Sequence, residues 1–174
     1  MIFEAADKMK NFEAGIFNIL DDKRKELESQ GRKIYNFSVG TPDFEPEEHI
    51  MKAVSEACLH PENYRYALSD RDELLEAVIR RYKHRYHTDI AKNEIMSVYG
   101  SQEGMTHIFL PLINPGDVVL LPNPGYPIFN TGAFVAQASQ WLYPLTEEND
   151  YLPDLAAIPE DVRRAAKVMV VSYP

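Results

Sequence analysis

The order of apolar segments after residue 94 constrains the fold of this chain more than any other feature. Short runs rich in β-branched and aromatic residues alternate there with longer segments whose apolar residues recur at helical spacing. The predicted strands are "EIMSVYG", "DVVLLP", "SQWLYPL" and "VMVV", and the predicted helices span residues 101–113, 125–137 and 153–165. Such alternation is typical of an α/β domain, because parallel strands need crossover connections. We therefore predict a three-layer α/β/α arrangement from residue 49 onward, with a mostly parallel and incomplete sheet.

The first half of the sequence predicts helices instead of alternating strands. Apolar residues recur at helical spacing in residues 1–33, 46–59 and 72–86. Gly31 is the expected stop of the first helix, since glycine readily adopts the left-handed conformation that ends many helices. Between the first two helices, "KIYNF" resembles a short strand that leads into a loop at Gly40.

Composition and charge exclude several classes of function. The chain has 174 residues, 45% of them hydrophobic, which suits one globular domain or slightly more. Its formal net charge of −9 repels nucleic acid and anionic membranes, and no apolar run approaches the roughly 20 residues of a membrane helix. The one cysteine, Cys58, excludes an internal disulfide, so we expect a cytoplasmic protein. A small anion could still bind at a helix N-terminus.

The segment "VYGSQEGM", residues 98–105, is the first candidate binding site. Ser101 is the expected N-cap of the helix that follows Gly100, and the first turn would offer free N–H groups to a phosphate. Ordinary helix capping explains the same residues and is the commoner role of such a serine. A nucleophilic serine is a third interpretation, but its usual pattern, Gly-x-Ser-x-Gly, is not met because Gly100 directly precedes Ser101.

Two further segments offer weaker candidates. "NPGDVVLLPNPGYPIF" places Tyr126 at the C-terminal end of a predicted strand, the edge at which open α/β sheets bind ligands. Its ring could stack on a flat ligand or simply pack half-buried. In "SVGTPDF", Gly40 would let a backbone N–H approach a ligand, although a plain turn also explains it. His84 and His87 lie in the basic helix end "RRYKHRYH", where a solvated face explains them better than a metal, and we expect no metal site.

Taken in order, these segments resemble the class I and II aminotransferases of fold type I, which use pyridoxal 5′-phosphate (PLP). The resemblance runs from about residue 12 to the last residue and rests on "SVGTPDF", "NYRYALSD", "GSQEGM", "NPGDVVLLPNPGYPIF", "YLPDL" and "VMVVSYP". Within the family, the chain resembles an LL-diaminopimelate aminotransferase-like branch. The resemblance implies that residues 1–48 form an N-terminal arm and part of the small domain, and that residues 49–174 begin the PLP-binding large domain.

The resemblance also implies roles for individual residues. The backbone at Ser101 and Gln102 would hold the cofactor phosphate, and Tyr126 would stack on the pyridine ring. Tyr66 would reach the phosphate of the other subunit across a homodimer. Tyr64 is the alternative, because the loop lacks the family's usual glycine and its spacing looks one residue short.

The same resemblance bears on substrate and assembly. Gly40 would meet the substrate carboxylate. An incomplete sheet exposes strand edges and apolar surface, so we expect a homodimer or higher oligomer with residues 1–30 and the tyrosine loop near the partner.

The family's catalytic residues are expected outside this sequence. No lysine of the chain lies in a context that resembles the Schiff-base motif, and the resemblance places that lysine downstream of Pro174. The acid that pairs with the pyridine nitrogen and the arginine that binds the substrate carboxylate are expected there too. We therefore expect the N-terminal portion of an enzyme that transfers an amino group between an amino acid and a 2-oxo acid, inactive by itself. The alternatives are part of a related PLP-dependent carbon–sulfur lyase, or a non-catalytic binding or structural fragment.

Overall fold

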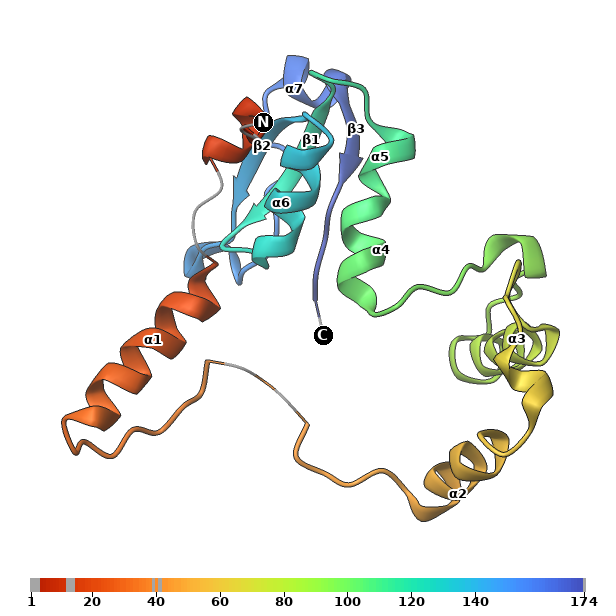
Figure 1. Ribbon diagram of the computed structural model, residues 1–174. Helices are drawn as coiled ribbons and strands as arrows, with labels where there is room; N and C mark the ends of the chain where they lie inside the picture. The colour runs from red at the N-terminus through yellow and green to blue at the C-terminus, as the bar shows by residue number, and fades with distance from the viewer. Residues whose placement is uncertain (1–3, 12–14, 39, 41, 174) are drawn as a thin grey trace. The chain divides into compact units, whose positions relative to one another are not determined.

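The structure, a computed structural model, describes residues 4–11, 15–38, 40 and 42–173 (Figure 1). The chain divides into two compact units, Met1–Tyr66 and Ala67–Pro174. Each unit is described by itself below. None of the helices in the described ranges combines the length and the apolar character that crossing a bilayer requires.

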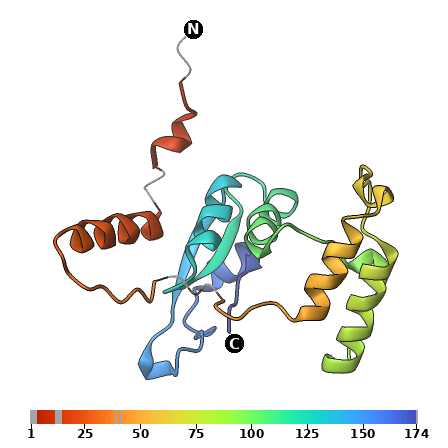
Figure 2. The same cartoon turned by 60° about the horizontal axis from the view of Figure 1, so that its bottom comes forward.

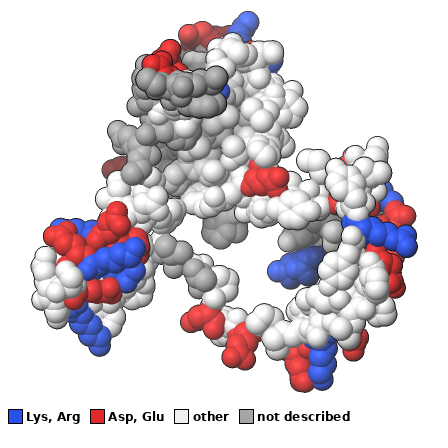
Figure 3. Space-filling model, viewed as in Figure 1, with Lys and Arg blue, Asp and Glu red and all other residues white. Residues whose placement is uncertain are grey.

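The N-terminal unit consists of helices and connecting segments. Its elements are the 3-10 turn η1 (Asp7–Asn11), the helix α1 (Ile16–Ser29), the helix α2 (Glu48–Ala57) and the 3-10 turn η2 (Pro61–Tyr64). Opposite charges alternate along α1 (Figure 3), where the Arg24 guanidinium pairs with Asp21 at 2.5 Å and with Glu28 at 2.8 Å. Pairs at these spacings lie on one side of the helix and stabilise it.

Two expectations for this unit need correction. The helix predicted over residues 1–33 is shorter, because α1 starts only at Ile16; residues 1–3 and 12–14 lie outside the described residues. Its stop is confirmed, since Gly31 follows the last turn with a φ of 77°. The run "KIYNF" was expected as a strand but has no regular structure, because a strand requires a ladder partner and the described residues of this unit offer none.

The second unit contains the sheet. Its helices are α3 (Asp72–Tyr86), α4 (Ser101–His107), α5 (Phe109–Leu112), α6 (Pro127–Val135) and α7 (Glu160–Ala165), with 3-10 turns η3 (Lys92–Glu94) and η4 (Glu147–Asn149). Its strands are β1 (Val118–Asn123), β2 (Ser139–Pro144) and β3 (Ala166–Met169). The strand order is β2-β1-β3, and both pairings are parallel, with Val118 opposite Ser139 and Ala166. The predicted parallel α/β arrangement is therefore confirmed.

Helices and loops cover both faces of the sheet, which gives the expected three layers. Along β1, alternate side chains point to opposite faces. Val119 and Leu121 enter the core beneath α4, α5 and α6, while Leu120 packs on the other face with Tyr143 and Ile158, beside α7. Figure 1 and Figure 2 show α6 lying along one face of the sheet, with α4 next to it.

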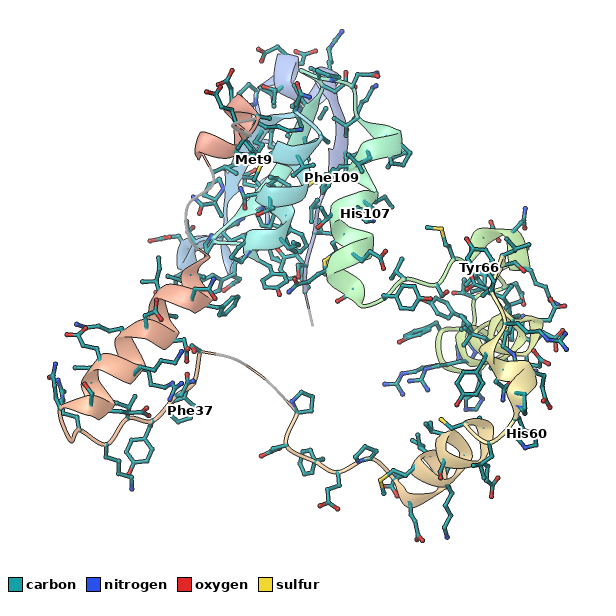
Figure 4. The ribbon with its side chains drawn as sticks, in the orientation of Figure 1. Met9, Phe37, His60, Tyr66, His107 and Phe109 are labelled. Atoms are coloured by element: carbon teal, nitrogen blue, oxygen red, sulfur yellow. The ribbon has the colours of Figure 1, made fainter. Side chains whose placement is uncertain are left out.

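A glycine allows α6 to approach α4 and α5 closely. A Cβ atom added at Gly132 would lie 2.8 Å from Cδ2 of Phe109 and 3.0 Å from Cα of Thr106. Phe109, labelled in Figure 4, is buried in this core. Any larger residue at position 132 would therefore push the helices apart.

The segment 94–100 was expected as a strand, and this is wrong. It pairs with no strand among the described residues; instead the N–H of Ser97 donates to the carboxylate of Asp70 at 3.0 Å, and the Ser97 hydroxyl donates to the same group. These hydrogen bonds hold the pKa of Asp70 below its ordinary value. The Asp70 carboxylate, 27 residues away in the sequence, has thus taken the hydrogen bond that a ladder partner would have used.

Three boundaries also differ from the expectation. The helix predicted over 101–113 is split into α4 and α5 because Pro111 has no N–H for the carbonyl of His107. The helix predicted over 153–165 begins only at Glu160, as α7. The last strand, β3, starts two residues before the predicted run at 168–171.

Candidate functional site

The candidate site lies at the carboxyl end of β1, where the chain turns into α6. The strand ends at Asn123, and Tyr126 is the N-cap residue of α6, directly before Pro127. The Tyr126 side chain is half-buried, and its ring meets that of Phe129 edge-on, with centroids 6.0 Å apart and planes at 86°. Tyr126 therefore stands at the sheet edge where we expected it, anchored on one side by a buried aromatic ring.

The start of α4 differs in detail from the prediction. Gly100, not Ser101, is the N-cap, with φ 90° and ψ 147°, a conformation that favours glycine. Ser101 is the first residue inside the helix, and the N-cap position has no side-chain capping bond. The N–H of Glu103 donates to the Gly100 carbonyl at 3.1 Å, whereas the N–H groups of Ser101 and Gln102 have no acceptor among the described residues. Two adjacent amides are therefore available to an anion.

The charges around these amides are mixed. The Glu103 carboxylate accepts the N–H of Tyr99 at 2.5 Å and lies 3.8 Å from Nδ1 of His107. An acid in the first turn stabilises the start of the helix but does not attract an anion. Any phosphate here would therefore depend on direct hydrogen bonds from the two amides more than on the field of a short helix.

A side-chain hydrogen bond joins the two halves of the site. The Gln102 amide group donates to the Tyr126 hydroxyl, which links the first turn of α4 to the residue that starts α6. The structure thus brings Ser101, Gln102 and Tyr126 together at one sheet edge. The sequence assigned Gln102 only a backbone role, and no pattern in the sequence signals its side-chain contact, since the two residues are 24 positions apart.

The other two predicted residues belong to the N-terminal unit. Gly40 is exposed, and the residues on either side of it lie outside the described ranges. Tyr66, labelled in Figure 4, is 89% exposed, and its hydroxyl has no partner in the part of the chain that the structure describes. The Tyr64 hydroxyl, in contrast, donates to the Cys58 carbonyl at 2.7 Å. Of the two tyrosines, Tyr66 is therefore the one whose hydroxyl remains available to a ligand.

Known proteins resemble this chain along its whole length. The sequence profile of the family "Aminotransferase class I and II" matches residues 32–174. The LL-diaminopimelate aminotransferase of Aquifex aeolicus is 39% identical over 175 residues, which cover 99% of this chain and 45% of that protein. The corresponding enzyme of Syntrophobacter fumaroxidans is 35% identical, again over 45% of its length.

Solved structures agree with the sequence comparison. The apo structure of BacF from Bacillus subtilis superposes with a TM-score of 0.90 at 35% identity, covering 100% of this chain and 45% of that one. A probable N-succinyldiaminopimelate aminotransferase from Thermus thermophilus gives a TM-score of 0.81 at 35% identity, over 89% of this chain and 42% of that one. The chain thus spans less than half the length of the relatives it matches. With its profile match and its shared fold, the chain belongs to the class I and II aminotransferase family.

Proposed function

We propose that the protein is a PLP-dependent aminotransferase, or the N-terminal part of one, which moves an amino group between an amino acid and a 2-oxo acid. The observation that carries the proposal is the meeting of two free backbone amides, at Ser101 and Gln102, with the ring of Tyr126. A phosphate needs N–H donors and a planar heteroaromatic ring needs a flat neighbour. The residues at this sheet edge offer both, so they fit the cofactor that the family uses.

Within this proposal, the chain's own residues bind and orient. Ser101 and Gln102 donate backbone N–H groups to the cofactor phosphate, and Tyr126 covers one face of the ring and excludes water from it. Gly40 receives the substrate carboxylate, and Tyr66 reaches the phosphate site of the other subunit in a homodimer. When bound, PLP supplies an electron sink for the bond that breaks at the substrate's α-carbon.

The proposal assigns no proton transfer to residues 1–174. Amide groups and an aromatic ring can position a reactant but cannot form an imine with the cofactor, which requires an amine. We therefore infer that a polypeptide of residues 1–174, tested alone, binds PLP in the millimolar range at best and catalyses nothing. A few hydrogen bonds and one stacked ring contribute a few kcal/mol, against several kcal/mol of lost translational and rotational freedom.

The relatives' names suggest the substrate class. The Aquifex and Syntrophobacter proteins are named LL-diaminopimelate aminotransferases. We propose LL-diaminopimelate as the first amino donor to test, with a 2-oxo acid as the acceptor. A carbon–sulfur lyase of the same cofactor class would instead release a thiol, ammonia and a 2-oxo acid from a sulfur-containing amino acid. An assay for the thiol and for ammonia separates the two activities.

The binding proposal can be tested at a single backbone amide. Ser101→Pro removes the N–H at the first position of α4, where proline is tolerated, and Ser101→Ala is the matched control that keeps the N–H. In the natural full-length gene product, we expect Ser101→Pro to weaken PLP binding by about 10-fold or more, because a hydrogen bond to a charged group is worth about 1.5–3 kcal/mol. Ser101→Ala should weaken it much less. Equal effects of the two variants would contradict the assignment of the amide.

A second experiment tests the inactivity of the short chain. PLP is titrated into residues 1–174 and into the full-length product, with absorbance and amino-donor turnover as readouts. We expect turnover only in the full-length product. Borohydride trapping of the cofactor on one lysine of residues 1–174, with turnover, would overturn the proposal that this segment binds the cofactor but does not catalyse.

A further inference from the structure

We propose that the side chain of Gln102 is a positioning residue that fixes the direction in which the Tyr126 ring points. The inference rests on the proposed function, because it concerns the face that Tyr126 offers to a bound flat ring. It assigns to Gln102 a second task, separate from that of its backbone N–H.

The Tyr126 ring is held at both ends. At its body, the ring of Phe129 meets it edge-on at 6.0 Å and 86°. Phe129 lies in the buried core cluster, so this contact is fixed by the sheet and α6. At its tip, the hydroxyl accepts a hydrogen bond from the Gln102 amide. The hydroxyl oxygen lies on the axis about which χ2 turns, so the Gln102 bond restrains χ1, whereas the edge-on contact with Phe129 restrains χ2, the plane of the ring.

Without Gln102, the ring would keep its packing against the core, including Phe129, but its hydroxyl would lose this hydrogen bond. Tyr126 is half-buried and Gln102 is exposed, so the hydrogen bond between them lies at the surface. A ring that swings must be ordered when a ligand stacks on it, and this ordering reduces affinity. The hydrogen bond orders the ring already in the ligand-free protein, so less conformational entropy is lost when a ligand binds.

Gln102 is itself on a rigid support. Its carbonyl accepts the Thr106 hydroxyl at 2.9 Å, one turn further along α4. Thr106 lies at the close approach of α4 to α6 around Gly132. The donor and the acceptor of the hydrogen bond thus stand on two helices whose separation is set by core packing, which is what a positioning contact requires.

The test uses two single variants and their combination in the full-length product. Gln102→Ala keeps the backbone N–H but removes the donor, and Tyr126→Phe keeps the ring but removes the acceptor. We expect each to weaken PLP binding about fivefold, and the double variant to be no weaker than the weaker single one, because both remove the same bond. The absorption maximum of the bound cofactor should shift in the same direction in all three variants.

The matched control is Tyr151→Phe. It deletes the same hydroxyl from a tyrosine of the same unit, and the Tyr151 side-chain hydroxyl has no partner among the described residues. This variant should bind PLP as the unaltered protein does. Strictly additive effects of Gln102→Ala and Tyr126→Phe, or no effect of Gln102→Ala, would overturn the inference.

A cofactor-free measurement separates this inference from the proposed function. Tyrosine labelled with ¹³C at the ring carbon that bears the hydroxyl reports the environment of that hydroxyl. In the protein without PLP, the Tyr126 resonance should move on Gln102→Ala and stay in place on Tyr151→Phe. An unmoved resonance overturns the positioning role whatever the cofactor does. A moved resonance in a protein that fails to bind PLP supports the contact and refutes the proposed function instead.

Discussion

The substitution Gly132→Ala sets two physical effects against each other. In the interior of α6, alanine is favoured over glycine by about 1 kcal/mol because glycine loses more backbone entropy on folding. The structure opposes this gain, since the added Cβ would lie 2.8 Å from the Phe109 ring and 3.0 Å from Cα of Thr106. Phe109 is only 1% exposed and the second atom is backbone, so neither neighbour has room to move. Overpacking of this kind costs about 1–3 kcal/mol, and contacts this short belong to the upper part of that range.

The expected net effect is a loss of about 1–2 kcal/mol in the free energy of unfolding. The chain supplies a matched control in Gly104→Ala, which is also a glycine inside a helix, α4. Its added Cβ would come no closer than 3.4 Å to a Val98 methyl group, an ordinary contact. Gly104→Ala should therefore keep most of the propensity gain and raise stability by up to about 1 kcal/mol.

Urea unfolding followed by tryptophan fluorescence measures both changes. The chain has one tryptophan, Trp141, which lies in β2 and packs against the core of the sheet unit. Its signal thus reports the unit that contains both glycines. A second check is Phe109→Leu, which should cost less in the Gly132→Ala background than alone because the two side chains compete for one space. If Gly132→Ala proves as stabilising as Gly104→Ala, the close helix approach described here is wrong.

Three further predictions use the same unfolding assay. Leu121→Ala, at a fully buried position of β1, should cost about 2–5 kcal/mol, whereas Leu142→Ala, 45% exposed on β2, should cost far less. Tyr143→Phe removes a buried hydroxyl that donates to the carbonyl after β3 and should cost about 1 kcal/mol; a stability equal to that of the unaltered protein would count against this hydrogen bond. The ammonium of Lys167, at 2.6 Å, and a backbone N–H hold the pKa of Asp117 below its ordinary value. Its contribution to stability is therefore present above about pH 4 and is lost as the pH falls through the lowered folded-state pKa, so the deficit of Asp117→Asn should shrink on acidification.

The sequence predicted best where local and tertiary preferences coincide. The helix α3 has the predicted bounds, 72–86, because its apolar spacing, acidic first turn and basic last turn all favour the same segment. The strands β1 and β2 were likewise located within one residue. Gly, Pro or Asn lies near the ends of each strand. The side chains of β1 are buried on both faces of the sheet, and an uninterrupted apolar run is typical of such a central strand.

The prediction failed where secondary structure depends on a distant partner. Residues 94–100 have an apolar pattern suited to a strand, yet no ladder partner is present among the described residues and Asp70 takes the N–H of Ser97. The pattern reports the preference of a segment, but a strand exists only as a pair. The split between α4 and α5 is a different case, since the missing N–H of Pro111 was visible in the sequence and its effect was overlooked.

The residues of the candidate site could be predicted from the sequence only in part. Ser101 was placed at the sheet edge through a strand over residues 94–100 that the described residues do not form, whereas Tyr126 could be assigned there from the order of strands and helices. The hydrogen bond from Gln102 to Tyr126 could not be predicted from the sequence. It depends on the distance between α4 and α6, and Gly132, at the contact between these helices, sets that distance. A substitution that pushes these helices apart should therefore act at the site as well as on stability. Gly132→Ala offers that comparison: at a temperature where it remains folded, it should weaken PLP binding in the full-length product, whereas Leu142→Ala should leave binding unchanged. Unaltered PLP affinity in a folded Gly132→Ala protein would show that the geometry of the site is independent of the packing beneath it.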